Sequence, residues 1–452
     1  MNLPGSSSSP TFRGPCGPSR APPLARCCAA RDTASTSYPL NLNFFSSLSS
    51  FPPSPAPIAE PLPSPMTSDF QRCTRCIMDT TVPGIRFDAH GECNFCQLHD
   101  NMDRAFPLGE AGRRKVQELA ADIKQLGKGR KYDCVLGVSG GRDSSFTLWY
   151  CVTQLGLRPL AVHFNDGFGN PVAGENMLKA CRKLGVEMRT ITSDWRESKD
   201  LKIAFLKAST PDMEEGTDVG IATALYGVAA KEGIQRIIIG QSFRTEGIAP
   251  LSWNYLDGKY LKAVHQRFGS VPLRPWSPND PGFNLGLKEM FYYAFVRRIK
   301  TVTLLYHVDY VRSEVDELLA RELDWKNPGA HYFDDLYQSV IYYLNRTKFN
   351  IDRRLFNYSA LIRSGQMSRA TALERTSQIN SIEDPRVIDL CIKRLGLSRE
   401  EFDRIVATPP RTFHDYPNNY HLIRRLRWPI QVLSRLNLIP ESAYDKYFNC
   451  GT

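Results

Sequence analysis

A short segment at residues 139–144, with the sequence Ser-Gly-Gly-Arg-Asp-Ser, most constrains the fold of this chain. The apolar run before it, residues 131–138, predicts a buried strand, and a helical pattern follows. Its two glycines let the backbone turn sharply and bring N–H groups close to an anion, and the helix N-terminus adds a positive dipole end. We call residues 139–144 the phosphate loop. The Walker A pattern is absent, so this is not the loop of an ordinary kinase or GTPase.

Strands and helices alternate after the phosphate loop. The pattern predicts further strands at 160–164, 187–191 and 236–240, and helices at 177–184 and 217–233. This alternation predicts an α/β fold, in which helices cover both faces of a parallel sheet. Ligands of such sheets bind at the carboxyl ends of the strands.

Composition divides the chain into four expected parts. Residues 1–65 are rich in Ser and Pro and cannot bury a core, which predicts a disordered extension. It is either a wrongly assigned start before Met66 or a transit-like tail. Residues 66–110 are turn-rich and carry paired cysteines, residues 111–275 carry the alternating pattern, and residues 276–452 predict an α-helical C-terminal domain.

Four cysteines form two Cys-x-x-Cys pairs separated by sixteen residues. They are Cys73, Cys76, Cys93 and Cys96. This spacing can place four thiolates around one ion, which predicts a closed, structural Zn²⁺ knuckle. An iron–sulfur cluster remains an alternative, because the ligand type alone does not exclude iron.

The remaining composition restricts the function only broadly. Of 452 residues, 57 are Lys or Arg and 47 are Asp or Glu, a balance of +10 that permits an anionic partner without specifying it. No run approaches the roughly 18–20 apolar residues of a membrane span. The other cysteines do not form a disulfide framework, and no secretory signal precedes them, so we expect a cytoplasmic protein.

The phosphate loop resembles the SGGxDS hallmark of the PP-loop ATP pyrophosphatase superfamily. The resemblance implies that ATP binds with Mg²⁺ at the carboxyl edge of the sheet and is cleaved between its α and β phosphates. It also implies nucleotide contacts from the loop and from the ends of the second and fourth strands. The candidate cofactor-binding residues are Ser139, Gly140, Gly141, Asp143, Ser144, His163, Asn165, Gly240 and Gln241.

Four further stretches, residues 73–96, 224–247, 260–269 and 348–369, look like the N-acetyl sugar amidotransferases of surface-polysaccharide biosynthesis. This resemblance implies that ATP and ammonia convert the acetamido group of a sugar to an acetamidino group through an adenylylated intermediate. The sugar would be acidic or nucleotide-linked and would belong to lipopolysaccharide, O-antigen or a related glycan. The candidate catalytic residues are Asp143, Ser144 and Arg353.

The source of ammonia is expected to be a second protein. A fused class II glutaminase needs a cysteine after the initiator methionine, whereas Asn2 follows Met1 and Thr67 follows Met66. The family resemblance implies a partner glutaminase of the class I, triad type. We also expect substrate contacts after the fourth strand and in the 348–369 stretch, with surface charges or structural ion pairs as the alternative. These residues are Thr245, Glu246, Gly247, Trp253, Lys262, His265, Arg267, Arg353 and Arg354.

Two other functions compete with this hypothesis. A PP-loop enzyme that thiolates or lysidinylates tRNA would also suit a zinc knuckle and positive charge. Thiolation needs reactive cysteines near the loop, whereas Cys134 falls in a buried strand and Cys151 in a helix. Lys and Arg are also interspersed with acids, so nucleic acid is an unlikely partner by charge pattern. A non-enzymatic binding module is the second competitor, and the intact phosphate loop argues against it.

Overall fold

The sheet is parallel, as predicted, and its central strand, β1, is buried on both faces. In β1, Val135 packs against one layer of helices, while Cys134 and Leu136 pack against the other. Burial on both faces explains why this strand reads as a continuous apolar run. The strand order is β3-β2-β1-β4-β5, and all neighbouring strands are parallel. The strands are β1 (Cys134–Gly137), β2 (Pro159–Asn165), β3 (Met188–Thr192), β4 (Arg236–Ile239) and β5 (Lys300–Thr303).

The expected N-terminal tail, residues 1–65, lies outside the residues that the computed structural model describes. All described residues belong to one compact unit, Ser54–Thr452. The domain boundaries expected within this unit stay predictions. The described residues are 70–274, 282, 285–328, 335–377, 384–435 and 447–448.

Local sequence signals begin and end several of the helices. Gly185 ends α4 in the left-handed conformation, with φ +64°. Asp384 caps α13, whose first residue is Pro385, and Ser398 and Glu401 form a capping box at α14. The helices are α1 (Asn94–Ala105), α2 (Gly109–Leu126), α3 (Arg142–Thr153), α4 (Pro171–Leu184), α5 (Trp195–Ala208), α6 (Glu215–Lys231), α7 (Gly258–Phe268), α8 (Leu287–Phe291), α9 (Arg312–Leu323), α10 (Gln338–Thr347), α11 (Arg354–Arg363), α12 (Arg369–Ser377), α13 (Pro385–Leu395), α14 (Arg399–Val406), α15 (Tyr420–Arg425) and α16 (Arg427–Arg435).

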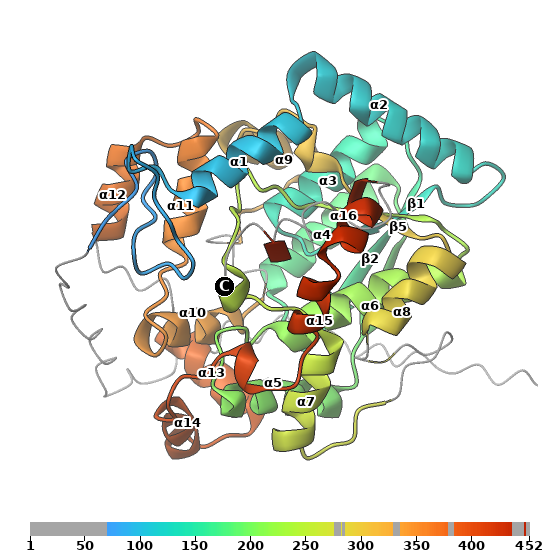
Figure 1. Cartoon of the computed structure of the whole chain (residues 1–452). Coiled ribbons are helices and arrows are strands. Elements are labelled where there is room, and N and C mark those ends of the chain that lie inside the picture. The colour runs from blue at the N-terminus through green and yellow to red at the C-terminus, as the bar shows by residue number, and fades with distance from the viewer. Residues whose placement is uncertain are drawn as a thin grey trace, which may run out of the picture. The chain divides into compact units, whose positions relative to one another are not determined.

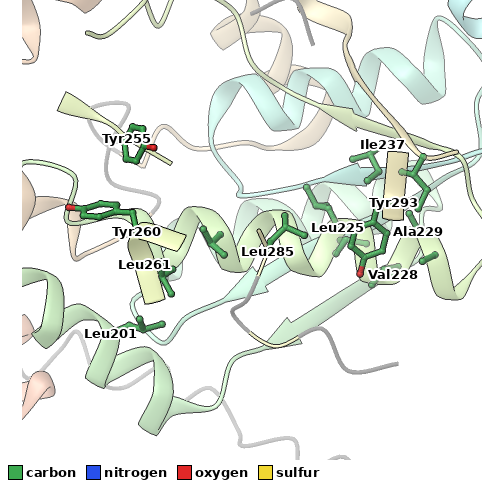
Figure 2. Packing of buried hydrophobic residues seen from close by; sticks show 14 of the residues in the cluster. Leu201, Leu225, Val228, Ala229, Ile237, Tyr255, Tyr260, Leu261, Leu285 and Tyr293 are labelled. Atoms are coloured by element: carbon green, nitrogen blue, oxygen red, sulfur yellow. The ribbon is translucent and has the colours of Figure 1, made fainter. Parts of the chain in front are cut away.

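Two layers of helices cover the sheet (Figure 1). Residues of α5, α6 and α7 form one core with the sheet, and residues of α2, α3, α4 and α9 form the other. Figure 2 shows Leu225, Val228 and Ala229 of α6 beside Ile237 of β4, with Tyr293 against them. The apolar residues of α6 therefore anchor it to the sheet, which places its amino end at the carboxyl edge of the strands.

The region after residue 285 is helical, as predicted, except for β5, which sequence analysis missed. Every residue of β5 is only partly buried, and its sequence shows no clear apolar pattern. Hydrogen bonding to β4 holds this segment as a strand. Helices α11 and α12 pack against the cysteine-bearing segment, residues 72–96 (Figure 1). In the part of the chain that the structure describes, no helix combines the length and apolar composition needed to cross a membrane.

Candidate active site and metal centre

The phosphate loop connects β1 to α3, as predicted, and one glycine fixes its backbone. Gly140 has φ +80°, and a Cβ atom added there would lie 2.0 Å from the carbonyl oxygen of Ala173. The carbonyl oxygen of Gly140 accepts hydrogen bonds from Trp325 Nε1 (3.0 Å) and Asn176 Nδ2 (3.1 Å). Only glycine fits this position without strain, and contacts from two distant segments hold the loop in place.

Two hydroxyl groups face each other across the loop. Ser139 Oγ and Ser144 Oγ are 3.1 Å apart, and the N–H of Gly141 donates to Ser139 Oγ over 3.3 Å. The end of β4 packs against them, because a Cβ atom on Gly240 would lie 2.8 Å from the backbone nitrogen of Ser144. Gln241, the next residue, is exposed. These candidates meet at the carboxyl edge of the sheet beside the amino end of α3, an arrangement that suits an anion.

Asp143 is buried at the start of α3, with 5% of its surface exposed. The hydroxyl group of Tyr310 donates a hydrogen bond to its carboxylate. Burial and the charge of Asp143 raise the pKa of Tyr310 well above its usual value, so this hydroxyl group remains a donor. Sequence analysis missed Tyr310, because it lies 167 residues from Asp143 and belongs to no motif.

The end of β2 contributes the two other predicted nucleotide-binding side chains. His163 Nδ1 lies 3.2 Å from the carbonyl oxygen of Val138, the residue before the loop. Burial lowers the pKa of His163, which favours the neutral ring. Because a carbonyl oxygen only accepts, this contact requires the proton on Nδ1. Asn165 Oδ1 accepts a hydrogen bond from the N–H of Gly167 (3.0 Å), so its side chain stabilises the turn that follows β2. Both residues lie at the predicted edge of the sheet, and their contact with a nucleotide stays a prediction.

A buried ion pair follows directly after β2. Lys202 Nζ lies 2.7 Å from Asp166 Oδ2, and the two side chains are 4% and 5% exposed. Lys202 also donates to Thr217 Oγ1 (2.8 Å), which donates to Asp166 (2.9 Å). The ammonium group lies 4.3 Å from the ring centroid of Tyr337, a cation–π contact. These contacts join α5, α6 and the C-terminal region at the end of β2.

Arg353 contacts α10, the helix that follows Tyr337 of the ion-pair site. Its Nη1 donates to Gln338 Oε1 (3.4 Å), and its guanidinium carbon lies 5.3 Å from the ring centroid of Tyr342. Gln338 donates in turn to Glu214. Burial and the nearby Asp218 raise the pKa of Glu214 to about 7, so this carboxyl group can exchange a proton near neutral pH.

Several residues expected to contact substrate have structural partners instead. His265 Nε2 lies 2.9 Å from Asp200 Oδ2, and both side chains are buried. Arg354 pairs with Asp352, with 2.7 Å between Nη2 and Oδ2. The guanidinium group of Arg267 lies over the ring of Phe268. The sequence shows that these side chains are polar, but it does not show which of them pair within the fold.

The four paired cysteines converge as predicted, and all four are fully buried. The sulfur–sulfur distances are 3.9 Å for Cys73–Cys96, 3.7 Å for Cys76–Cys93 and 3.7 Å for Cys93–Cys96. The N–H groups of Cys76 and Cys93 point at the sulfur of Cys73, over 3.4 and 3.3 Å. The four sulfurs lie close enough together to hold one metal ion, and we call these residues the cysteine centre.

Comparison with known families concerns the C-terminal region. Residues 330–427 match the family model described as "LPS biosynthesis protein WbpG-like, C-terminal domain". This region is WbpG-like. It includes helices α10 to α15, and thus Arg353 and the α11–α12 pair beside the cysteine centre. For this region, which includes residues 348–369, the match agrees with the resemblance to a surface-polysaccharide family.

Individual relatives are distant. The chain is 26% identical over 330 residues to "Uncharacterized protein MJ1599" of Methanocaldococcus jannaschii, which covers 72% of this chain and 99% of that protein. NMN synthetase from Francisella tularensis shares 12% identity over 64% of this chain and 95% of its own, with a TM-score of 0.28. U34-tRNA thiolase NcsA from Methanococcus maripaludis, solved with its 4Fe–4S cluster, shares 15% identity over 69% and 89%, with a TM-score of 0.27. The strand order and the phosphate loop, and not these distant structures, support the PP-loop type of fold.

Proposed function

We propose that this protein is the ATP-dependent synthase of a sugar amidotransferase in lipopolysaccharide or related glycan biosynthesis. It converts the acetamido group of an N-acetylated sugar to an acetamidino group. One observation supports this proposal most. The same chain contains an SGGRDS loop at the carboxyl edge of a parallel sheet and a WbpG-like region.

The chemistry explains why such a reaction needs ATP. An amide carbon is a poor electrophile, because its nitrogen donates electrons and its oxygen leaves poorly. Attack of the amide oxygen on the α-phosphorus of ATP forms an O–P bond and releases pyrophosphate. Ammonia then attacks the activated carbon, and AMP leaves with the original oxygen. The product carries nitrogen in place of that oxygen.

The phosphate loop supplies the groups for the first step. Ser139 and Ser144 donate to phosphate oxygens, and the amino end of α3 stabilises the charge that builds on pyrophosphate. Asp143, oriented by Tyr310, is the residue that would hold Mg²⁺, which neutralises phosphate charge when bound. Arg353, with Gln338 and Glu214 beside it, is the candidate for the sugar side of the site. A class I-type glutaminase subunit is proposed as the source of ammonia.

A tRNA-thiolating activity finds less support. Cys134 and Cys151, the cysteines nearest the loop in sequence, are both fully buried. Burial raises the pKa of each thiol, which disfavours the thiolate that sulfur transfer requires. Bulk tRNA bound tightly across a salt series would favour this alternative over sugar amidation.

Product analysis tests the proposal. The purified chain, with Mg²⁺-ATP, ammonium chloride at alkaline pH and a panel of nucleotide-linked N-acetyl sugars, is expected to release AMP and pyrophosphate. Mass spectrometry should find one sugar in which NH has replaced the acetyl oxygen. With glutamine in place of ammonium, the chain alone is expected to be inactive. Release of ADP would contradict the PP-loop chemistry, whereas turnover with glutamine would contradict only the need for a partner.

We propose Zn²⁺ as the occupant of the cysteine centre. Four sulfurs about 2.3 Å from one ion in a tetrahedron lie about 3.8 Å apart, which is close to the spacing in the cysteine centre. Cysteines that each bind a different iron of a cluster would lie further apart. With four protein ligands no coordination position is open, so the role is structural.

Metal analysis of the purified protein is expected to find about one zinc per chain. Cys73→Ser should strongly reduce the folded yield and the zinc content, because three ligands hold the ion less well. Cys181→Ser, which alters a buried cysteine of α4 away from the centre, is the matched control and should keep its zinc. Protein without zinc, in which all four thiols react freely, would contradict the assignment.

A further inference from the structure

Arg363, the last residue of α11, points its guanidinium group into the cysteine centre. Its Nε donates to Cys96 Sγ (3.2 Å), and its Nη2 donates to Cys76 Sγ (3.3 Å) and lies 3.9 Å from Cys93 Sγ. The same nitrogen lies 3.1 Å from the sulfur of Met78. One cation of the WbpG-like region therefore contacts three of the four ligands, 267 to 287 residues away in sequence.

Burying the charged guanidinium group of Arg363 costs free energy unless a nearby negative charge compensates it. Arg363 is 9% exposed, and a guanidinium group keeps its charge in proteins. A buried cation needs an anionic partner, and the guanidinium group of Arg363 donates its hydrogen bonds to the cysteine sulfurs. Four thiolates around one divalent ion carry a net charge of about −2. Arg363 halves this charge within a centre that is closed to water.

Two further contacts attach the same region to the backbone of the cysteine centre. Arg369, the first residue of α12, donates to the carbonyl oxygens of Cys76 and Cys73, both over 3.0 Å. Ser359 Oγ of α11 accepts a hydrogen bond from the N–H of Ile77 (3.3 Å). Helices α11 and α12 thus hold the backbone of the first cysteine pair and of the residue that follows it.

We infer that the metal centre is bipartite: the knuckle supplies four thiolates, and the WbpG-like region supplies Arg363 as the counter-cation that retains the ion. This inference rests on the proposed zinc assignment. Hydrogen bonds from a cation withdraw electron density from the thiolates and make them poorer nucleophiles. Without Arg363, the centre should lose its ion faster and react faster with alkylating reagents.

The rate of zinc release tests the role of Arg363. Zinc-loaded full-length protein is mixed with an excess of a chromogenic chelator, and the coloured complex is followed with time. Arg363→Gln, which removes the charge, is expected to release zinc about 10–100-fold faster than wild type, the usual effect of removing a partner of a metal ligand. Arg363→Lys keeps the charge but loses the planar guanidinium group that donates to two sulfurs from separate nitrogens. Its rate of zinc release should therefore be intermediate. Arg354→Gln removes an arginine at the other end of α11 and should release zinc at the wild-type rate.

A second measurement separates this inference from a folding defect. Iodoacetamide should alkylate the four cysteines of zinc-loaded Arg363→Lys faster than those of wild type, at an unchanged circular dichroism spectrum. If Arg363→Gln does not fold, the lysine variant carries the test alone. Wild-type release and alkylation rates in the folded Arg363 variants would overturn the inference while zinc binding stands. Wild-type protein that binds no zinc would instead overturn the zinc assignment itself.

Discussion

Asp143→Asn is expected to lower the rate of AMP formation by about 10²–10³-fold, the usual loss when one group that stabilises transition-state charge is removed. Asparagine has nearly the same size, and its side-chain oxygen can still accept the hydrogen bond from Tyr310. The fold should therefore survive, while the negative charge that would hold Mg²⁺ is lost. Release of pyrophosphate from ATP, measured across a magnesium series, checks this and should show a raised magnesium requirement.

Two further variants show whether charge or position matters at Asp143. Tyr310→Phe keeps the carboxylate but removes its hydrogen bond, so it should lose less activity than Asp143→Asn. Asp133→Asn neutralises a buried carboxylate at the other end of β1, where it pairs with Arg158, and should spare the magnesium requirement. An Asp143→Asn protein that forms AMP at the wild-type rate would contradict the role assigned to this residue.

The sequence predicted those parts of the site that are local along the chain. The phosphate loop follows β1 and runs into the first turn of α3, so apolar patterning and two glycines were enough to place it. The ends of β2 and β4 joined it because parallel strands share one carboxyl edge, and Gly240 indeed packs against Ser144. The cysteine centre was predicted for a similar reason, since ligand spacing alone carries its signal.

The groups that the sequence did not predict act across long separations. Tyr310 and Arg363 are ordinary residues in their own segments, and only tertiary contacts bring them to Asp143 and to the cysteines. Strand β5 was missed because it is partly buried throughout and depends on β4 for its conformation. His265 shows the reverse error, because a polar side chain after a strand can pair within the core, here with Asp200.

The phosphate loop and the cysteine centre are also connected through the WbpG-like region. The turn after α11 places Gln366, whose Nε2 donates to the carbonyl oxygen of Tyr310 (3.0 Å). Gln366 Oε1 accepts from the N–H of Arg312 (3.0 Å), so the turn holds the segment that carries Tyr310. Arg363, the last residue of α11, precedes Gln366 by three residues. The same short stretch therefore contacts the thiolates directly and supports the tyrosine that orients Asp143.

Lys202→Met is expected to destabilise the protein by about 3–5 kcal/mol, the cost of leaving one partner of a buried ion pair uncompensated. Methionine fills a similar volume, so the loss comes mainly from the charge of Asp166, which is 5% exposed at the end of β2. Urea denaturation followed by circular dichroism measures the change. Lys207→Met alters an exposed lysine of the same helix, α5, and should change the stability little.

The double variant Asp166→Asn/Lys202→Met distinguishes lost charge compensation from lost packing. It should recover much of the stability, because the charge of Asp166 is then removed together with that of its partner Lys202. The pH dependence gives an independent check. Burial raises the pKa of Asp166, but the charge and hydrogen bond of Lys202, together with hydrogen bonds from Phe168 and Thr217, lower it more, so the folded value lies below the unfolded one. For a carboxyl group of this kind, the stabilisation is complete above about pH 4, the unfolded pKa of an aspartate, and is lost as the pH falls through the folded pKa. Wild type should therefore lose stability on acidification more steeply than the double variant. A Lys202→Met protein as stable as Lys207→Met would contradict the role of the ion pair in stabilising the end of β2.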